Sequence, residues 1–252
     1  MFNKKFCGVL VVFFLLLLSV DAQEVGDDYG KSILRKEWNW FAMIHSNGWG
    51  FGYRKGLQKT LLQKHFFELE FNTMKHDKEI RGRNPYYSNA KSYSYGKLNR
   101  MDVLRAGVGT QHVLNTKPYW GGTEVRYFYY GGFSLGLVSP VYLYIIKLDT
   151  VDYNPIIDLE KYDPEKHDLD NIYGGGPLGK GWFEITPHPG AYLKSGFSFE
   201  FGTDDHKVRS LDVGAILDVY PYTVQLMAYN PKQYYFLSFY LSLHFGSRYD
   251  YY

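Results

Sequence analysis

The chain has 252 residues, and its charges nearly balance, with 28 lysines and arginines against 26 aspartates and glutamates. This balance gives no sign of a nucleic-acid partner. Aromatic residues make up 19% of the chain, glycine occurs 26 times, and cysteine occurs once, at Cys7. Such a composition is typical of β structure with many tight turns.

The first 22 residues predict a cleaved secretory signal. Lys4 and Lys5 form a short positive region, and an uncharged apolar run follows from Cys7 to Val20. A transmembrane anchor is the alternative, but this run is about 14 residues long, and an anchor needs roughly 20 to cross the hydrocarbon. We therefore expect cleavage after Ala22, export from the cytoplasm, and a mature chain without cysteine.

Beyond a short periplasmic segment expected at 23–36, the sequence alternates in hydropathy as β-strands do. From Tyr235 to Phe245 the odd positions are all apolar or aromatic, and the even positions are mostly small or polar. A soluble sandwich also alternates, but its outer face normally carries long rows of Lys, Thr and Glu. Here the polar positions are rich in Gly and Ser with isolated charges. This pattern favours a narrow barrel whose apolar face meets lipid.

The predicted fold is therefore all-β, a transmembrane antiparallel up-and-down β-barrel of eight strands over residues 37–252. The strands are expected near 37–45, 49–57, 65–76, 99–113, 124–143, 191–203, 208–220 and 234–247. An even number suits a bacterial single-chain barrel, and Asn47-Gly48 predicts a type I′ hairpin turn. The run around the fifth strand, or the stretch 222–230, could contain another strand, so ten strands is the alternative.

Charged residues on the inward-facing positions predict a network inside the lumen. An eight-strand barrel has an interior just wide enough for side chains, and an unpaired charge there costs several kcal/mol. The network is expected either to seal the lumen with ion pairs or to line a gated ion path. Its members are Arg54, Glu68, Glu70, Arg105, Lys194, Glu200, Asp212 and Asp218.

Two long connections, 77–98 and 144–190, are expected on the extracellular side. The first is basic and tyrosine-rich, and residues of these types are favoured in protein interfaces. The second is acidic, so the two loops are expected to pack on each other or on a partner. The interaction residues predicted in the first loop are Arg81, Arg83, Tyr86, Tyr87, Tyr93 and Tyr95. Weak candidates for calcium in the second are Asp163, Glu165, Asp168 and Asp170.

The final segment, from Tyr234 to Gly246, resembles the carboxy-terminal strand of outer-membrane barrels, although a tail from Ser247 to Tyr252 follows it. The Phe245-Gly246-Ser247-Arg248 ending and the high tyrosine content resemble small outer-membrane barrels of the Bacteroidota, the PorT-like and OmpX-like groups. The resemblance implies a Gram-negative outer membrane as location. Members of those groups range from passive barrels to subunits of secretion, gliding and barrel-assembly machines.

Three functions follow from these observations. The first is a structural or assembly subunit of a cell-envelope complex, in contact with outer-membrane lipid, lipopolysaccharide and other envelope proteins. The second is a narrow pore or passive transporter. The third, a lipid-modifying enzyme, is the least favoured, because no histidine is followed by serine at the second position and no nucleophile with its base can be assembled. No cofactor and no catalytic residue are expected.

Overall fold

The computed structural model describes residues 35–60, 62–116, 122–148, 155–177, 179–202 and 206–250. The predicted signal and most of the predicted periplasmic segment lie outside these residues. No helix in the described part of the chain is both long and apolar enough to cross a membrane.

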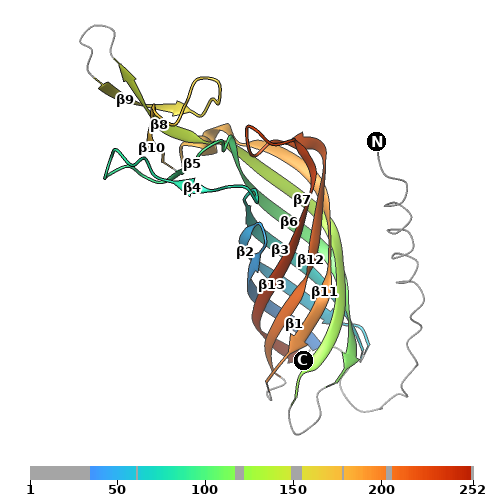
Figure 1. The fold of residues 1–252 in the computed structure, drawn as a ribbon. Helices are drawn as coiled ribbons and strands as arrows, with labels where there is room; N and C mark the ends of the chain where they lie inside the picture. Colours follow the sequence, from blue (N-terminus) through green and yellow to red (C-terminus); the bar gives the residue numbers. More distant parts are fainter. Residues whose placement is uncertain are drawn as a thin grey trace. The chain divides into compact units, whose positions relative to one another are not determined.

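Within the described residues, eight long antiparallel strands close into a barrel (Figure 1). Each strand pairs with its neighbour along the chain, and β13 closes the circle against β1, from Arg35↔Asp250 to His45↔Tyr240. The barrel strands are β1 (Arg35–His45), β2 (Gly48–Gln58), β3 (Gln63–Met74), β6 (Asn99–Asn115), β7 (Glu124–Pro140), β11 (Thr186–Glu200), β12 (Lys207–Val224) and β13 (Gln233–Asp250). The predicted count of eight barrel strands is confirmed, and the alternative of ten is wrong.

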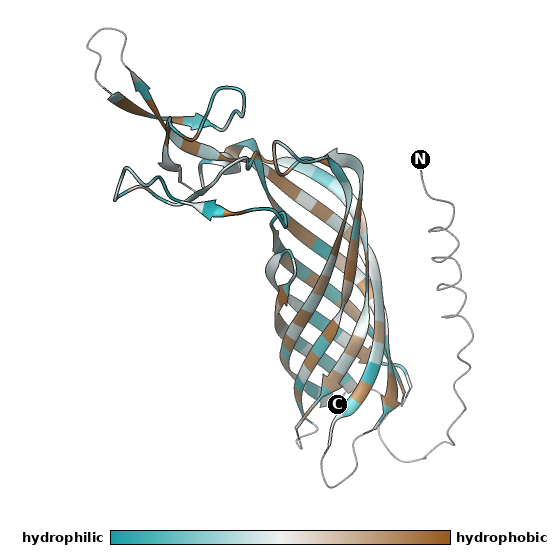
Figure 2. Ribbon diagram, in the orientation of Figure 1, coloured by the Kyte–Doolittle hydropathy of each residue, from teal (hydrophilic) through white to brown (hydrophobic). Residues whose placement is uncertain are grey.

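Strand periodicity sorts the side chains as predicted. Along β13 the odd positions from Tyr235 to Phe245 are between 42% and 65% exposed, while Ser238, Tyr240 and His244 on the even positions are buried. The same alternation of apolar and polar positions runs along the other barrel strands (Figure 2). Because successive side chains of a strand point to opposite faces, the outside of the barrel is apolar and its inside is polar.

Five smaller strands lie outside the barrel, in the connections that the sequence predicted as loops. The strands β8 (Tyr142–Leu148), β9 (Pro155–Lys161) and β10 (Ile172–Gly175) form a sheet in the order β10-β8-β9. The strands β4 (Arg81–Gly82) and β5 (Tyr93–Ser94) pair with each other. A short 3-10 helix, η1 (Lys180–Glu184), leads into β11. We call this part of the molecule, residues 76–98, 141–148, 155–177 and 179–185, the platform.

The platform corrects two predicted strand limits. The fifth barrel strand ends at Pro140 rather than at 143, because Tyr142 already belongs to β8, which pairs with β9 and β10 outside the barrel. The sixth barrel strand begins at Thr186 rather than at 191, and it pairs with β7 from its first residue. Pro187 and Pro189 concealed this start, because proline removes a ladder donor and argues against a strand.

The first hairpin also differs from its prediction by one residue. His45 pairs with Gly48, so Ser46 and Asn47 form the two-residue turn and Gly48 is the first residue of β2. Gly48 has φ +154°, and a Cβ there would lie 2.1 Å from the carbonyl oxygen of Thr73. The glycine is therefore required for the close approach of β3 and not for the centre of the turn.

Glycines inside the barrel make room for the large side chains. A Cβ on Gly107 would lie 2.4 Å from the Tyr192 hydroxyl and 2.7 Å from the carbonyl oxygen of Gly131. We expect Gly107→Val to destabilise the barrel by at least about 1–3 kcal/mol, the usual cost of overpacking. The measurement is the heat-dependent shift in gel mobility of the refolded protein, followed through urea unfolding. Gly82→Val is the matched control, since a Cβ there meets nothing within 4 Å, and equal loss in both variants would contradict the assignment.

Candidate functional site

The interior of the barrel holds the charged side chains that the sequence singled out. All eight are at most 3% exposed, and each forms at least one ion pair. The structure divides them between two groups at different levels along the strands. Seven lie in a central network, and Glu200 belongs to a second network at the short-turn end. The central seven are Arg54, Glu68, Glu70, Arg105, Lys194, Asp212 and Asp218.

Arg54 and Lys194 link one half of the central network. Arg54 Nε lies 2.6 Å from Glu68 Oε2, and Arg54 Nη1 lies 3.0 Å from Asp212 Oδ2. Lys194 Nζ donates to Glu68 at 2.7 Å and also to Glu70. These residues come from β2, β3, β11 and β12, so the ion pairs cross the lumen as well as joining neighbouring strands.

Arg105 completes the other half. Its Nη1 lies 3.1 Å from Glu70 Oε2, and its Nε and Nη2 hold both oxygens of Asp218 at 2.9 and 2.7 Å. This fork is the bidentate geometry in which guanidinium–carboxylate pairs are strongest. Glu70 also accepts from Asn72 Nδ2 at 3.2 Å. Through Glu70 the two halves form one continuous chain of ion pairs.

His244 borders the central network beside Asp212. Its Nε2 lies 3.1 Å from Asp212 Oδ2 and 3.0 Å from Ser242 Oγ, while its Nδ1 lies 3.0 Å from Asn39 Oδ1. Serine, histidine and a carboxylate are the groups of an acyl-transfer triad. Here Ser242, His244 and Asp212 are each at most 1% exposed, so a substrate carbonyl has no room to reach the serine. This cluster instead fixes the imidazole against the ion network.

Aromatic rings fill the space around the central cations. The guanidinium carbon of Arg54 lies 4.9 Å from the ring centre of Tyr130, and Lys194 Nζ lies 4.9 Å from that of Tyr240. Phe41 lies within cation–π distance of both cations. The same three aromatic residues belong to a buried cluster inside the barrel. The lumen at this level is therefore occupied by side chains.

The second network lies where β1 and β3 begin and β11 and β13 end. Glu37 pairs with Lys64 and with Arg248, each at 2.9 Å. Glu200 accepts from Arg248 at 2.9 Å and from Arg126 at 2.5 Å. Of these residues, Glu200 alone was predicted from the sequence. Lys64 and Arg248 lay one residue beyond the predicted strand limits, and Glu37 began its predicted strand, so the inward positions were not extended to them.

The platform has an apolar core of its own. Tyr93 from the first long connection packs with Leu143, Ile145, Tyr162 and Ile172 from the second. Burial raises the pKa of Tyr162 to about 12, so the phenol stays neutral at physiological pH. The two predicted loops thus do pack on each other, but an apolar cluster joins them rather than their opposite charges.

Backbone and ring contacts strengthen this junction. Asn84 Nδ2 donates to the carbonyl oxygen of Ile172 at 2.7 Å, and the amide of Gly175 donates to the carbonyl oxygen of Lys91 at 3.1 Å. The rings of Tyr87 and Tyr173 lie 4.9 Å apart. The platform is consequently a folded unit and not a pair of independent loops.

The predicted interaction residues of the first loop divide into two sets. Arg81, Arg83, Tyr86 and Tyr87 are exposed, and Tyr86 is exposed by 82%. Tyr93 is buried and Tyr95 packs against the same cluster, so both lie at the contact between the two connections, which is one of the two predicted arrangements. The tyrosine count alone could not separate these roles, because tyrosine is common in both environments.

The acidic stretch does not assemble into a cation site among the described residues. No group of three or more His, Cys, Asp or Glu within them is placed to hold a metal ion. Asp163 instead caps its own turn, accepting from the amide of Glu165 at 3.1 Å and from Lys166 Nζ at 3.3 Å. The candidates Asp163, Glu165, Asp168 and Asp170 are therefore not brought together.

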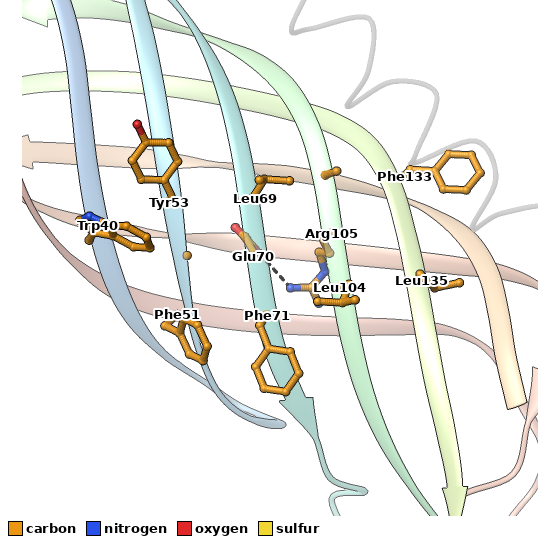
Figure 3. Close-up of a pocket in the computed structure, with 12 residues that line it drawn as sticks. Trp40, Phe51, Tyr53, Leu69, Glu70, Phe71, Leu104, Arg105, Phe133 and Leu135 are labelled. Atoms are coloured by element: carbon orange, nitrogen blue, oxygen red, sulfur yellow. Dashed lines mark hydrogen bonds and ion pairs between the residues drawn. The ribbon is translucent and has the colours of Figure 1, made fainter. Parts of the chain in front are cut away.

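The outer surface of the barrel carries an apolar hollow of about 510 Å³ (Figure 3). Trp40, Phe51 and Phe71 stand around it, and Ala106 leaves space between the larger side chains. The Glu70–Arg105 ion pair lies at the same level of the barrel. Polar and apolar side chains are thus separated by the thickness of one β-sheet.

Removing one partner of a buried ion pair should lower the free energy of unfolding more than removing both partners together. Asp218→Leu leaves Arg105 without its bidentate partner, and we expect it to lower the free energy of unfolding by about 3–5 kcal/mol. Arg105→Met/Asp218→Leu removes both charges and should lose clearly less than the sum of the two single variants. Urea unfolding in detergent micelles measures all four proteins. Strict additivity would contradict the network.

Removing one platform contact should loosen the platform while the barrel stays folded. Asn84→Ala removes the hydrogen bond to Ile172, and we expect faster proteolytic cleavage within 76–98 while the barrel keeps its heat-dependent gel shift. A loss of about 1–3 kcal/mol in local stability is the usual cost of leaving a buried acceptor unsatisfied. Asn89→Ala, at an exposed position, is the control. Identical cleavage rates in the two variants would show that the platform does not depend on this contact.

No family model matches the sequence, and no curated protein matches it. The chain is similar to solved structures at low identity. Neisserial surface protein A is 10% identical, with 86% of this chain and 98% of that chain covered and a TM-score of 0.37. Ail, the attachment invasion locus protein of Yersinia pestis, solved in complex with the heparin analogue sucrose octasulfate, is 6% identical, with 86% and 100% covered and a TM-score of 0.38. The N-terminal β-barrel domain of Pseudomonas aeruginosa OprF is 8% identical, with 85% of this chain and 97% of that chain covered and a TM-score of 0.33. The closed barrel described above is established by this chain's own strand pairing.

Proposed function

We propose that this chain is an integral outer-membrane β-barrel with a sealed lumen, acting as a structural or assembly subunit of a cell-envelope complex. The support for a membrane location is the apolar outer face. A soluble protein rarely exposes contiguous apolar patches of more than a few hundred Å². In a closed barrel each strand is paired with a neighbour on both sides, which is the condition for placing a sheet in hydrocarbon. The predicted signal at 1–22 is consistent with export.

The single observation that supports a sealed lumen is the central ion network. Arg54, Lys194 and Arg105 each pair with carboxylates from more than one strand. A permeating ion would have to break these pairs and displace the aromatic rings beside them. Because removing one partner from a buried pair costs several kcal/mol, steady conduction is disfavoured. These paired charges and packed rings favour the structural role over the narrow pore.

The platform is the part of the molecule that would meet other envelope proteins. It is folded around its own core, which presents a rigid surface rather than a mobile loop. Its exposed side includes Tyr86, Arg83 and Ile80, and tyrosine and arginine are enriched among the residues that dominate binding energy. The partner is an envelope protein on the extracellular side, with lipid and lipopolysaccharide around the barrel. A Bacteroidota origin and a role in secretion, gliding or barrel assembly remain part of this proposal.

A sealed lumen predicts no steady ion current. Purified protein refolded into planar lipid bilayers should give no long-lived conductance steps at ±100 mV or less, a voltage worth about 2.3 kcal/mol per elementary charge. A porin reconstituted in the same way is the positive control. Regular, long-lived steps from the wild-type protein would overturn the sealed lumen and support the pore.

Substitutions on the platform surface should abolish partner binding, whereas a substitution at the other end of the barrel should not. Tyr86→Ala/Arg83→Ala should abolish stoichiometric co-purification of envelope proteins in mild detergent, because both side chains are exposed and neither supports the core. Tyr249→Ala, an exposed tyrosine at the other end of the barrel, should leave co-purification unchanged. A wild-type protein that purifies alone from native outer membranes would contradict the subunit role.

A further inference from the structure

The ladder between β11 and β12 stops before the platform end of the two strands, and we call this stretch the seam. The strand β11 pairs with β7 from Thr186 onward, but its pairing with β12 begins only at Ala191↔Val219. The strand β12 itself continues to Val224. Residues 186–190 and 220–224, all of them described, therefore lie on neighbouring strands (Figure 1) without a ladder between them.

Prolines explain why this ladder stops. Residues 187 and 189 are prolines, yet the pairing of this stretch with β7 is continuous. The missing N–H groups therefore belong to the edge that faces β12, since alternate residues of a strand direct their backbone groups to opposite neighbours. Extending the register beyond Ala191↔Val219 would set Pro189 opposite Pro221. Two prolines cannot exchange the paired N–H···O bonds that such a position requires, so the ladder cannot continue through this stretch.

A polar cavity of about 260 Å³ lies beside this seam, which we call the vestibule. Thr186 and His188 line it from β11, Thr223 from β12, and Asn99 from β6. Val138 and Val224 also line it and belong to the buried apolar cluster of the upper barrel. The vestibule thus combines polar walls with contact to an apolar cluster.

The vestibule is cationic. Lys161 and Lys232 line it, and neither forms an ion pair with any residue that the structure describes. Glu184 lines it too and accepts from the Tyr142 hydroxyl, so the lining carries two positive charges against one negative charge. Two unpaired ammonium groups with hydroxyl and amide donors around them suit a phosphate, which accepts several charge-assisted hydrogen bonds at once.

Exposed aromatic side chains lie on β12 and in η1, which packs against β7 and leads into β11. Tyr222 in β12 is 66% exposed, and in η1, directly before β11, Trp182 is 59% and Phe183 96% exposed. Aromatic rings with a polar atom favour the headgroup level of a bilayer. A ligand at the seam would therefore have lipid-compatible surface outside it and cationic surface inside it.

We infer that the vestibule binds the phosphorylated headgroup of an amphiphile, which enters sideways through the β11–β12 seam while its alkyl chain stays on the outer face. This inference rests on the membrane location proposed above, and it adds a ligand to the structural role. The phosphate lies between Lys161 and Lys232, and the chain passes the proline-rich edges.

Binding of dodecyl phosphate tests the inference on the full-length protein in neutral detergent, by isothermal titration. We expect saturable binding at one site, weakened at least about tenfold in Lys161→Met/Lys232→Met, because two charge-assisted hydrogen bonds are lost. Lys55→Met/Lys91→Met, which removes two exposed lysines outside the vestibule, should bind as the wild type does. No saturable binding, or equal weakening in both double variants, would overturn the site.

Two further measurements distinguish lateral entry of an amphiphile from binding of a soluble anion. Inorganic phosphate at the same concentration should bind at least about tenfold more weakly than dodecyl phosphate, because it has no alkyl chain to lie against the apolar outer face of the barrel. A dodecyl phosphate carrying a terminal diazirine should cross-link residues 186–190 or 220–224. Equal binding of inorganic phosphate, or cross-links confined to other strands, would overturn lateral entry. The proposed function is judged separately, since membrane fractionation and conductance are read without this ligand.

Discussion

The narrow lumen of the closed barrel is the constraint on which the rest of the structure depends. Its interior is only as wide as the side chains that fill it, and a charge placed there must find a partner or cost several kcal/mol. Arg105 satisfies this condition by holding Asp218 with two nitrogens and Glu70 with a third. Glycine supplies the remaining space, as at Gly107, whose missing side chain admits the hydroxyl of Tyr192. The closure of the barrel therefore requires both the ion pairs and the glycines at these positions.

The two ends of the barrel differ in how their charged side chains are paired. At the short-turn end, a second set of ion pairs joins β1, β3, β7, β11 and β13, from Glu37 to Arg248. At the platform end, Pro189 and Pro221 stop the ladder, and the lining changes from paired charges to the unpaired Lys161 and Lys232. The described interior is thus filled by paired charges and aromatic rings at its centre, while polar side chains line a cavity at the platform end. A structural role in the envelope, with a lipid-accessible vestibule, is consistent with this asymmetry.

Much of the fold was predictable because strand alternation is local. The inward positions of Glu68, Glu70 and Asp212 follow from the period of two, once one face is known to be apolar. The partners of these residues were not predictable, because Arg54 reaches Asp212 across 158 positions of sequence. The platform was missed for a different reason. Its strands are short, and the pairing of Tyr93 with the Leu143–Ile172 cluster depends on contacts between distant segments. Proline obscured the start of β11, where the residues that argue against a strand also end the ladder with β12.

A spin-label scan of β13 in lipid bilayers tests the central claim most directly. Nitroxides placed one at a time from 235 to 245 are exposed to oxygen, which concentrates in lipid, and to a nickel chelate, which stays in water. A membrane-embedded, sealed barrel predicts high oxygen and low chelate accessibility at the odd positions, and low accessibility to both at the even positions. Chelate access at the odd positions would contradict the membrane location. Chelate access at the even positions would contradict the sealed lumen.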